Sequence, residues 1–452
     1  MAANERINSP ISTPELERRW AEVRAAMAED RIDALVMQSN NDWMGGYVKY
    51  FTDVPATNER INHPISTPEL ERRWAEVRAA MAEHRIDALV MQSNNDWMGG
   101  YVKYFTDVPA TNGYPVTVIF PKDERMTVIG QGPMGVVREF GPQGDPVRRG
   151  TARFIGMPSY ASCPYTADYD AELAEKALAR YAGGTIGLLG RAAMSFALGD
   201  HLRRALAKAK FVDASDQVDR IKAIKSPEEL ERIRKTAMLQ DKAMEETFAA
   251  IKPGMRELEV AAIAEHAGHK HGSEQGLFLA GSGPVGTAAV FANRYQQNRV
   301  LREGDQFTLL VENNGPGGFY TELGRTCVLG RASQEMKDEF AFVLEAQKFT
   351  LERLVPGAKC SEIFAEYNDF MKKNKRPEEK RLHSHGQGYD MVERPLVRHD
   401  ETMTIERNMN MVCHPTYVTA TTYSWCCDNF LIGENGVAER LHRFPQKIFE
   451  LG

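Results

Sequence analysis

The chain begins with a duplicated segment, and this duplication limits how its N-terminal part can fold. Residues 4–57 recur almost unchanged as residues 58–111. The two copies differ at only two pairs of positions, Ser9/His63 and Asp30/His84. Solenoid repeats diverge more than this and need several stacked copies to bury a core. Only the second copy continues directly into the strand-like stretch at residues 113–121, so we expect that copy to occupy the native place.

Each copy has the pattern of a helix, a strand and a loop. The helical stretch ISTPELERRWAEVRAAMAE has a Ser/Thr–Pro start and apolar residues at helical spacing, and IDALVMQS is typical of a strand. If the second copy is native, the first is an extra lobe, a mispacked segment, or a segment exchanged with a partner chain. A recent duplication or an assembly artefact would explain why the copies are so similar.

Strands and helices alternate after the duplication. The stretches at residues 116–121, 126–132 and 185–190 are strand-like, and those at 171–184 and 195–209 are helical. Such alternation predicts an α/β domain with a mixed or parallel sheet. We therefore divide the chain into a duplicated unit (residues 1–57), an α/β domain (58–216) and a C-terminal domain (217–452).

The composition of the chain argues against several classes of binding partner. With 42% apolar and 26% charged residues, the chain has the composition of a globular protein, and its net charge of −6 gives no basic surface for nucleic acid. No apolar run approaches the roughly 20 residues of a membrane span. Six cysteines are too few for a disulfide scaffold in 452 residues. We expect a cytoplasmic protein that acts on a small molecule, without nucleic-acid or membrane partners.

Four motifs in the C-terminal half carry a family resemblance. They are GGFYTELGRT (residues 317–326), HSHGQGYDMVERP (383–395), NMNMVCHP (408–415) and CCDNFLIGENG (426–436). In this order they resemble the pita-bread superfamily, which contains creatinase, aminopeptidase P, prolidase and methionine aminopeptidase. The resemblance implies an α+β pita-bread catalytic domain behind an α/β N-terminal domain, and a homodimer.

The resemblance also implies a metal site, but its ligands are exchanged. The family's first aspartate falls at Val311 or, with a one-residue slip, at Glu312. Its other four ligand positions correspond to Glu322, His385, His414 and Cys427. One carboxylate, two imidazoles and one thiolate suit a transition metal such as zinc, iron or manganese rather than magnesium or calcium. We interpret the four as a single-metal site; the alternative is a metal-free pocket, as in creatinase.

Other exchanges affect the predicted catalytic and substrate-binding residues. Asn293 and Val392 stand where the family has histidines, and neither can carry protons near neutral pH. The candidates for catalysis are Glu393, Asp390, Tyr320 and His383. His383 is alternatively a donor to the ligand group or a solvent-facing residue. The predicted substrate-binding residues are Asn293, Glu312 and Arg325, although Arg325 is also interpreted as a structural partner of nearby carboxylates.

The sequence favours an enzyme similar to creatinase and aminopeptidase P that hydrolyses a C–N bond of a small polar substrate. Three alternatives stay open. A lyase or decarboxylase of a small carboxylate would use Asp390 or Glu393 as proton carrier, because the spacing of Asp390 from His385 resembles that of metal-dependent sulfoniopropionate lyases. A residual Xaa-Pro peptidase is the second alternative, and a non-catalytic binding protein is the third.

Overall fold

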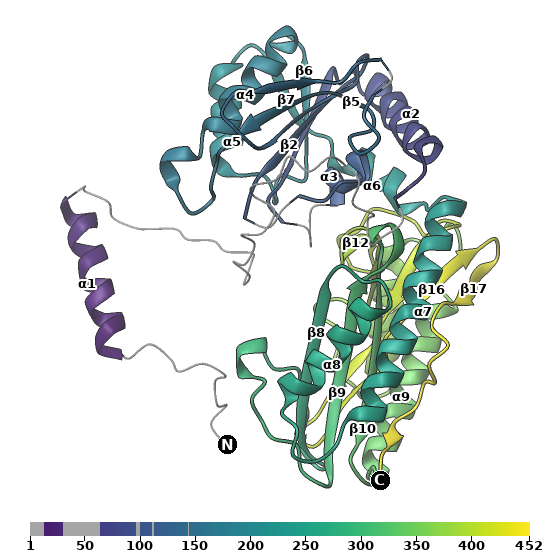
Figure 1. Cartoon of the computed structure of the whole chain (residues 1–452). Helices are drawn as coiled ribbons and strands as arrows, with labels where there is room; N and C mark the ends of the chain where they lie inside the picture. The colour runs from purple at the N-terminus through teal and green to yellow at the C-terminus, as the bar shows by residue number, and fades with distance from the viewer. Residues whose placement is uncertain (1–12, 30–63, 96–99, 111–112, 143) are drawn as a thin grey trace.

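A computed structural model describes residues 13–29, 64–95, 100–110, 113–142 and 144–452. Two domains follow one another along the chain, and Figure 1 shows the first in blue to teal and the second in teal-green to yellow. As the sequence predicted, an α/β N-terminal domain precedes an α+β C-terminal domain.

The N-terminal domain is built on a seven-stranded mixed sheet with the order β4-β5-β3-β2-β1-β6-β7. Its strands are β1 (Ala88–Ser93), β2 (Val116–Pro121), β3 (Met126–Gln131), β4 (Val137–Glu139), β5 (Thr151–Met157), β6 (Thr185–Leu189) and β7 (Lys210–Asp213). Its helices are α2 (Thr67–Glu83), α3 (Gly100–Thr106), α4 (Tyr169–Leu178), α5 (Phe196–Ala205) and α6 (Ser215–Ala223), with short 3-10 turns η1 (Pro164–Thr166) and η2 (Ala179–Tyr181). The expected domain boundary at residue 216 falls within α6.

The two copies of the duplicated helix have different surroundings. Helix α1 (Thr13–Glu29) and helix α2 have the same 17-residue sequence. In α2, Trp74 is 8% exposed and its indole N–H donates to the carbonyl of Phe105 at 2.8 Å. The equivalent Trp20 of α1 is 51% exposed, and Figure 1 shows α1 apart from both domains. The rest of the first copy lies outside the described residues.

Four α-helices and two linked sheets form most of the C-terminal domain. Helix α7 (Pro227–Ala250) begins at a capping box in which Ser226 and Glu229 satisfy each other's backbone N–H groups. Figure 1 shows α7, α8 (Glu257–Lys270) and α9 (Gln334–Leu351) running alongside the strands. The remaining helical elements are α10 (Cys360–Lys373), η3 (Arg294–Gln296) and η4 (Pro316–Gly318).

The first of these sheets has the order β18-β10-β9-β8 and the second β12-β11-β13-β16-β17. The strands are β8 (Gly276–Pro284), β9 (Asp305–Asn314), β10 (Tyr320–Val328), β11 (Ser384–Gly386), β12 (Glu393–Leu396), β13 (Asn410–Cys413), β16 (Asp428–Gly433), β17 (Gly436–Arg440) and β18 (Phe449–Glu450), with a separate hairpin of β14 (Thr416–Val418) and β15 (Tyr423–Trp425). A bridge between Gly324 and Cys427 joins the two sheets, so β10 and β16 lie next to each other. This junction brings the motifs at residues 317–326 and 426–436 together.

Buried ion pairs hold the two domains against each other. Arg73 of α2 is fully buried, and its guanidinium lies 2.8 Å from the Glu229 carboxylate of α7 and donates to the Tyr389 hydroxyl. Ser66, which caps α2, donates its hydroxyl to Glu228. The second copy of the duplicated segment therefore contributes directly to the interface with the C-terminal domain.

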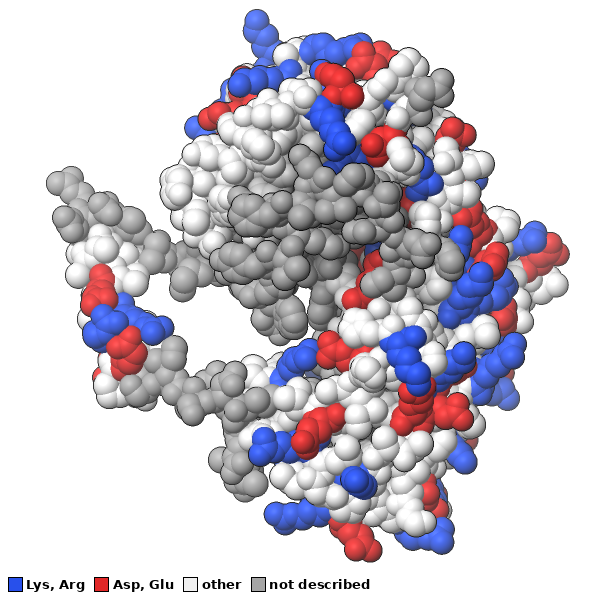
Figure 2. Space-filling view, viewed as in Figure 1, with Lys and Arg blue, Asp and Glu red and all other residues white. Residues whose placement is uncertain are grey.

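Surface charge and helix composition add two observations. On the face shown in Figure 2, basic and acidic side chains are interspersed over the described parts of both domains. Among the described residues, no helix is both long enough and apolar enough to cross a membrane. All six cysteines belong to the described part of the chain and are free thiols.

Candidate metal centre

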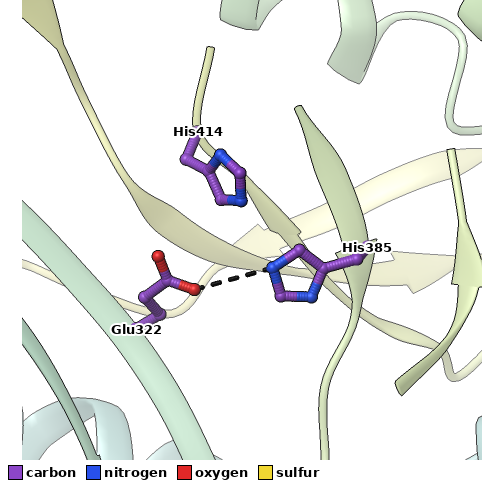
Figure 3. A group of neighbouring side chains, drawn as sticks. All are labelled: Glu322, His385 and His414. Atoms are coloured by element: carbon purple, nitrogen blue, oxygen red, sulfur yellow. Dashed lines mark ion pairs between the residues drawn. The ribbon is translucent and has the colours of Figure 1, made fainter. Parts of the chain in front are cut away.

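Three of the four predicted ligands converge in the interior of the C-terminal domain. Glu322 is on β10, His385 is on β11, and His414 directly follows β13. One ligand atom from each of the three side chains lies within 4.8 Å of the other two, and Figure 3 shows the three side chains facing a common point. His385 Nε2 lies 3.6 Å from a carboxylate oxygen of Glu322. All three residues are buried.

The fourth predicted ligand, Cys427, lies beside this group but is not a member of it. Its Sγ is 3.6 Å from the backbone carbonyl of Glu322. Burial and the charge of Glu322 raise the pKa of the thiol well above its usual value, so Cys427 is a neutral thiol in this environment. Cys427 also packs with Leu310 and Trp425 in a small apolar cluster.

Electrostatics leave Glu322 and His414 in forms that can donate electron pairs. Burial alone raises the pKa of Glu322, but the hydrogen bond from His385 and the attraction to the two imidazoles when they are protonated outweigh burial, and the pKa falls to about 2. Burial lowers the pKa of His414, and Glu322 opposes this shift only in part. The result is an ionised carboxylate next to a neutral imidazole, which are the protonation states that metal ligands need.

Glu312 stands directly opposite Glu322 across β9 and β10. This register places Glu312 on the same face of the strands as Glu322, whereas Val311 lies in the apolar core. Burial and the neighbouring charge of Glu322 raise the pKa of Glu312 well above its usual value. Without a cation, Glu312 is therefore the carboxyl that favours its protonated form while Glu322 is ionised, because each buried carboxylate disfavours ionisation of the other.

A network of buried amides supports this carboxyl pair, and the sequence analysis missed it. The Gln387 side chain donates to Glu312 at 2.9 Å, and Asn429 donates to both Gln387 and Asn410. The Asn429 carbonyl oxygen accepts the backbone N–H of Glu322 at 2.7 Å. These amides belong to the sequence motifs HGQG, NMNM and CCDNF. Amide side chains in strands that are expected to be buried could therefore have indicated this network.

Asp390 and Glu393, the first choices for acid/base catalysis, belong to a different cluster at the domain junction. Glu393 lies 3.3 Å from the Lys222 ammonium and 3.0 Å from that of Lys225. Despite burial, these lysines lower the pKa of Glu393 to about 2. Asp390 lies 3.7 Å from Lys222 and accepts the backbone N–H of Gly100. Both carboxylates are engaged in joining the domains, so their predicted catalytic role loses its geometric support.

The predicted site residues His383, Tyr320 and Asn293 do not belong to the group of three candidate ligands. His383 is fully buried and stacks on Tyr367 with ring centroids 3.6 Å apart, so the solvent-facing alternative is wrong. Its ring nitrogens have no hydrogen-bond partner in the described part of the chain. Tyr320 is buried at the start of β10, where its backbone N–H donates to Gly388. Asn293 precedes η3 and its amide donates weakly to Gln296 at 3.5 Å.

Arg325 is a structural residue in this fold. Its guanidinium pairs with Asp428 at 2.8 Å, and both side chains are 0% exposed. The remaining donors are directed at backbone carbonyls, those of Gly324, Cys427, Phe444 and Pro445. This arrangement favours the interpretation as a partner of a nearby carboxylate and leaves no donor for a substrate.

Comparisons with known proteins agree with this architecture. Residues 73–224 match the creatinase/prolidase N-terminal domain, and residues 231–438 match metallopeptidase family M24. An uncharacterized hydrolase/peptidase of Sinorhizobium fredii is 28% identical over 319 residues, which are 67% of this chain and 77% of the relative. A Xaa-Pro dipeptidase of Pyrococcus furiosus is 27% identical (58% and 75%), and a creatinase of a Bacillus species is 24% identical (70% and 74%).

Solved structures share the fold. The X-Pro aminopeptidase of Thermotoga maritima superposes with a TM-score of 0.69 at 20% identity, covering 83% of this chain and 99% of that chain. The dipeptidase PepE of Mycobacterium ulcerans gives a TM-score of 0.68 at 19% identity, covering 86% and 99%. With both family matches in chain order on this fold, the chain belongs to the pita-bread superfamily and is a hydrolase of the creatinase and Xaa-Pro peptidase type.

Proposed function

We propose that this hydrolase cleaves a C–N bond of amide type in a small polar substrate, at a site where Glu322, His385 and His414 hold one divalent transition-metal ion. The observation that carries the proposal is the convergence of one carboxylate and two imidazoles from separate strands within 4.8 Å. Catalytic zinc sites use three protein ligands of this kind and keep a position open for water or substrate. The mixed nitrogen and oxygen donors suit zinc, iron or manganese.

Each protein group near the ion has a defined part in this proposal. A bound ion would supply Lewis acidity to a substrate oxygen or to water. Glu312 stands opposite Glu322 across β9 and β10 and is not a member of the ligand group, so its carboxyl can carry a proton beside the ion. We therefore assign proton transfer to Glu312 in place of Asp390 and Glu393. Gln387 fixes the orientation of the Glu312 carboxyl.

Metal analysis tests the ligand assignment. Protein purified without chelators should carry about one equivalent of a transition metal, and His385→Ala, His414→Ala and Glu322→Gln should each lower this at least tenfold. The control is His399→Ala, because His399 is exposed and outside the group. Wild-type protein with less than about a tenth of an equivalent, after incubation with zinc, iron and manganese in turn, would reject the metal centre.

Product analysis in ¹⁸O-water tests the reaction class. Creatine and Xaa-Pro dipeptides are the first substrates to try, because the relatives include a creatinase and Xaa-Pro dipeptidases. Label in the product means hydrolysis, whereas cleavage without label would instead support a lyase or decarboxylase. We expect slow Xaa-Pro cleavage, because Asn293 and Val392 replace imidazoles. Metal binding without turnover of any small amide would favour the non-catalytic binding protein.

We also propose a homodimer in the cytoplasm, from the resemblance and the free thiols. Light scattering at micromolar concentration tests the dimer. A monomer at all concentrations would refute it.

A further inference from the structure

The N-terminal domain contains a cavity of about 550 Å³ that the proposed function does not use. Its lining residues all fall between Thr106 and Pro158, far along the chain from the three metal-site residues. The volume is within the range of small-molecule sites, roughly 300–1,000 Å³. The cavity lies beside β2, β3 and β5, next to the loop that follows α3.

Most of the lining is apolar. The apolar lining includes the side chains of Val108, Tyr114, Val128 and Phe154. The cavity is also lined by Gly130, which has no side chain. A methyl group on Gly130 would lie 3.1 Å from a ring carbon of Phe154, so glycine there leaves room for the ring beside β3. No lining residue is an aspartate or glutamate. The cavity therefore offers an aromatic surface without negative charge.

Arg148 brings a positive charge to this apolar lining. Its guanidinium carbon lies 4.3 Å from the centroid of the Phe154 ring. Burial lowers the pKa of Arg148, and the nearby Asp145 offsets this only in part. One oxygen of the Asp145 carboxylate already accepts the backbone N–H groups of Val147 and Arg148. The guanidinium is thus partly desolvated and stacked on one face.

The guanidinium of Arg148 makes no ion pair or side-chain hydrogen bond with the residues that the structure describes, unlike its neighbours in this domain. Arg149 pairs with Asp107, and Arg125 donates to the backbone carbonyls of Phe140 and Gly141. A partly buried cation without an acceptor is costly unless a ligand or water supplies one. The planar fork of arginine suits a carboxylate, which it binds through two parallel N–H groups.

We propose that this cavity binds a small organic acid, with its carboxylate on Arg148 and a flat apolar body against Phe154 and Val128. The site is separate from the candidate metal centre, and the proposal does not depend on the function proposed there. The cavity would give the N-terminal domain a ligand-binding role of its own.

Ligand-detected NMR on the full-length protein tests the proposal with 3-phenylpropanoate as probe. We expect saturable binding with a Kd on the order of 1 mM or tighter, as for a fragment of this size. Arg148→Gln should weaken binding about tenfold or more, because it removes the charge. Arg203→Gln is the matched control, since Arg203 is exposed on α5, outside the cavity lining, and should leave Kd unchanged. Val108→Trp fills the cavity and should abolish binding.

Two further probes separate the chemical contributions. The neutral 3-phenylpropanamide should bind about tenfold more weakly than the acid, and inorganic phosphate should not displace the acid at equal concentration. The proposal would be overturned by equal binding of the acid and the amide, by full displacement of the acid by phosphate, or by unchanged affinity for the acid in folded Arg148→Gln. The proposal would also be overturned if the acid showed no saturable binding at concentrations up to about 10 mM.

Discussion

Replacing Arg325 by glutamine should destabilise the C-terminal domain by about 3–5 kcal/mol, the range for breaking a buried ion pair. The substitution leaves the Asp428 carboxylate, which is 0% exposed, without its closest cation at 2.8 Å. It also removes donors from the carbonyls of Cys427 and Phe444. For a domain of this size the loss corresponds to a fall in Tm of roughly 6–20 °C.

Urea unfolding followed by circular dichroism and tryptophan fluorescence measures this loss. The matched control is Arg407→Gln, because Arg407 pairs with Glu434 on the surface, with side chains 61% and 71% exposed. That pair should contribute less than about 1 kcal/mol. If Arg325→Gln changed the unfolding free energy by less than about 1 kcal/mol, the buried-pair reasoning would be refuted. Reduced turnover in such a stable variant would restore the predicted substrate-binding role.

The Arg325–Asp428 pair should also make the stability of the fold depend on pH. Burial raises the pKa of Asp428, but Arg325 and His442 outweigh burial and lower it. A carboxyl group with a depressed pKa stabilises the fold above its unfolded pKa, about 3.9 for aspartate, and loses that contribution as the pH falls through the folded value. The stability difference between wild type and Arg325→Gln should therefore shrink below about pH 4.

Two further predictions concern Glu312 and the duplicated segment. Because the pKa of Glu312 is raised, its carboxyl favours the fold below about pH 4.3 and that contribution is lost as the pH rises. In chelator-treated protein, the Tm of Glu312→Gln should match that of wild type near pH 4 and exceed it near pH 8. Equal Tm values of the two proteins at both pH values would contradict the assignment of the proton to Glu312. Deleting residues 4–57 should leave a folded protein with Tm within about 2 °C and unchanged metal content. Loss of folding would show that the first copy is needed.

The sequence predicted those features that depend on local patterns. The capping residues Ser226 and Glu229 locate the start of α7, and strand-like runs locate β2, β3 and β6. The order of the motifs was enough to infer the superfamily. The convergence of Glu322, His385 and His414 followed from that resemblance and not from the spacing of the residues. Their roles as metal ligands stay predictions.

Contacts between distant segments could not be predicted in the same way. Glu393 is only eight residues from His385, but its partners Lys222 and Lys225 come from the preceding domain boundary. A strand residue's side chain can face either of two directions, and the choice depends on strand pairing that the sequence does not reveal. The same limit applies to Glu312, whose place opposite Glu322 follows from the register of β9 and β10.

The identical sequences of α1 and α2 have a consequence for how the chain reaches its native state. Nothing within the 17 residues can decide which copy docks, because both present the same tryptophan, arginine and valine. The decision must come from flanking positions and connectivity. His84 follows α2 where Asp30 follows α1, and an acidic residue at a helix C-terminus is unfavourable. Docking the first copy would also turn the second into a long internal loop, with a closure entropy that the observed arrangement avoids.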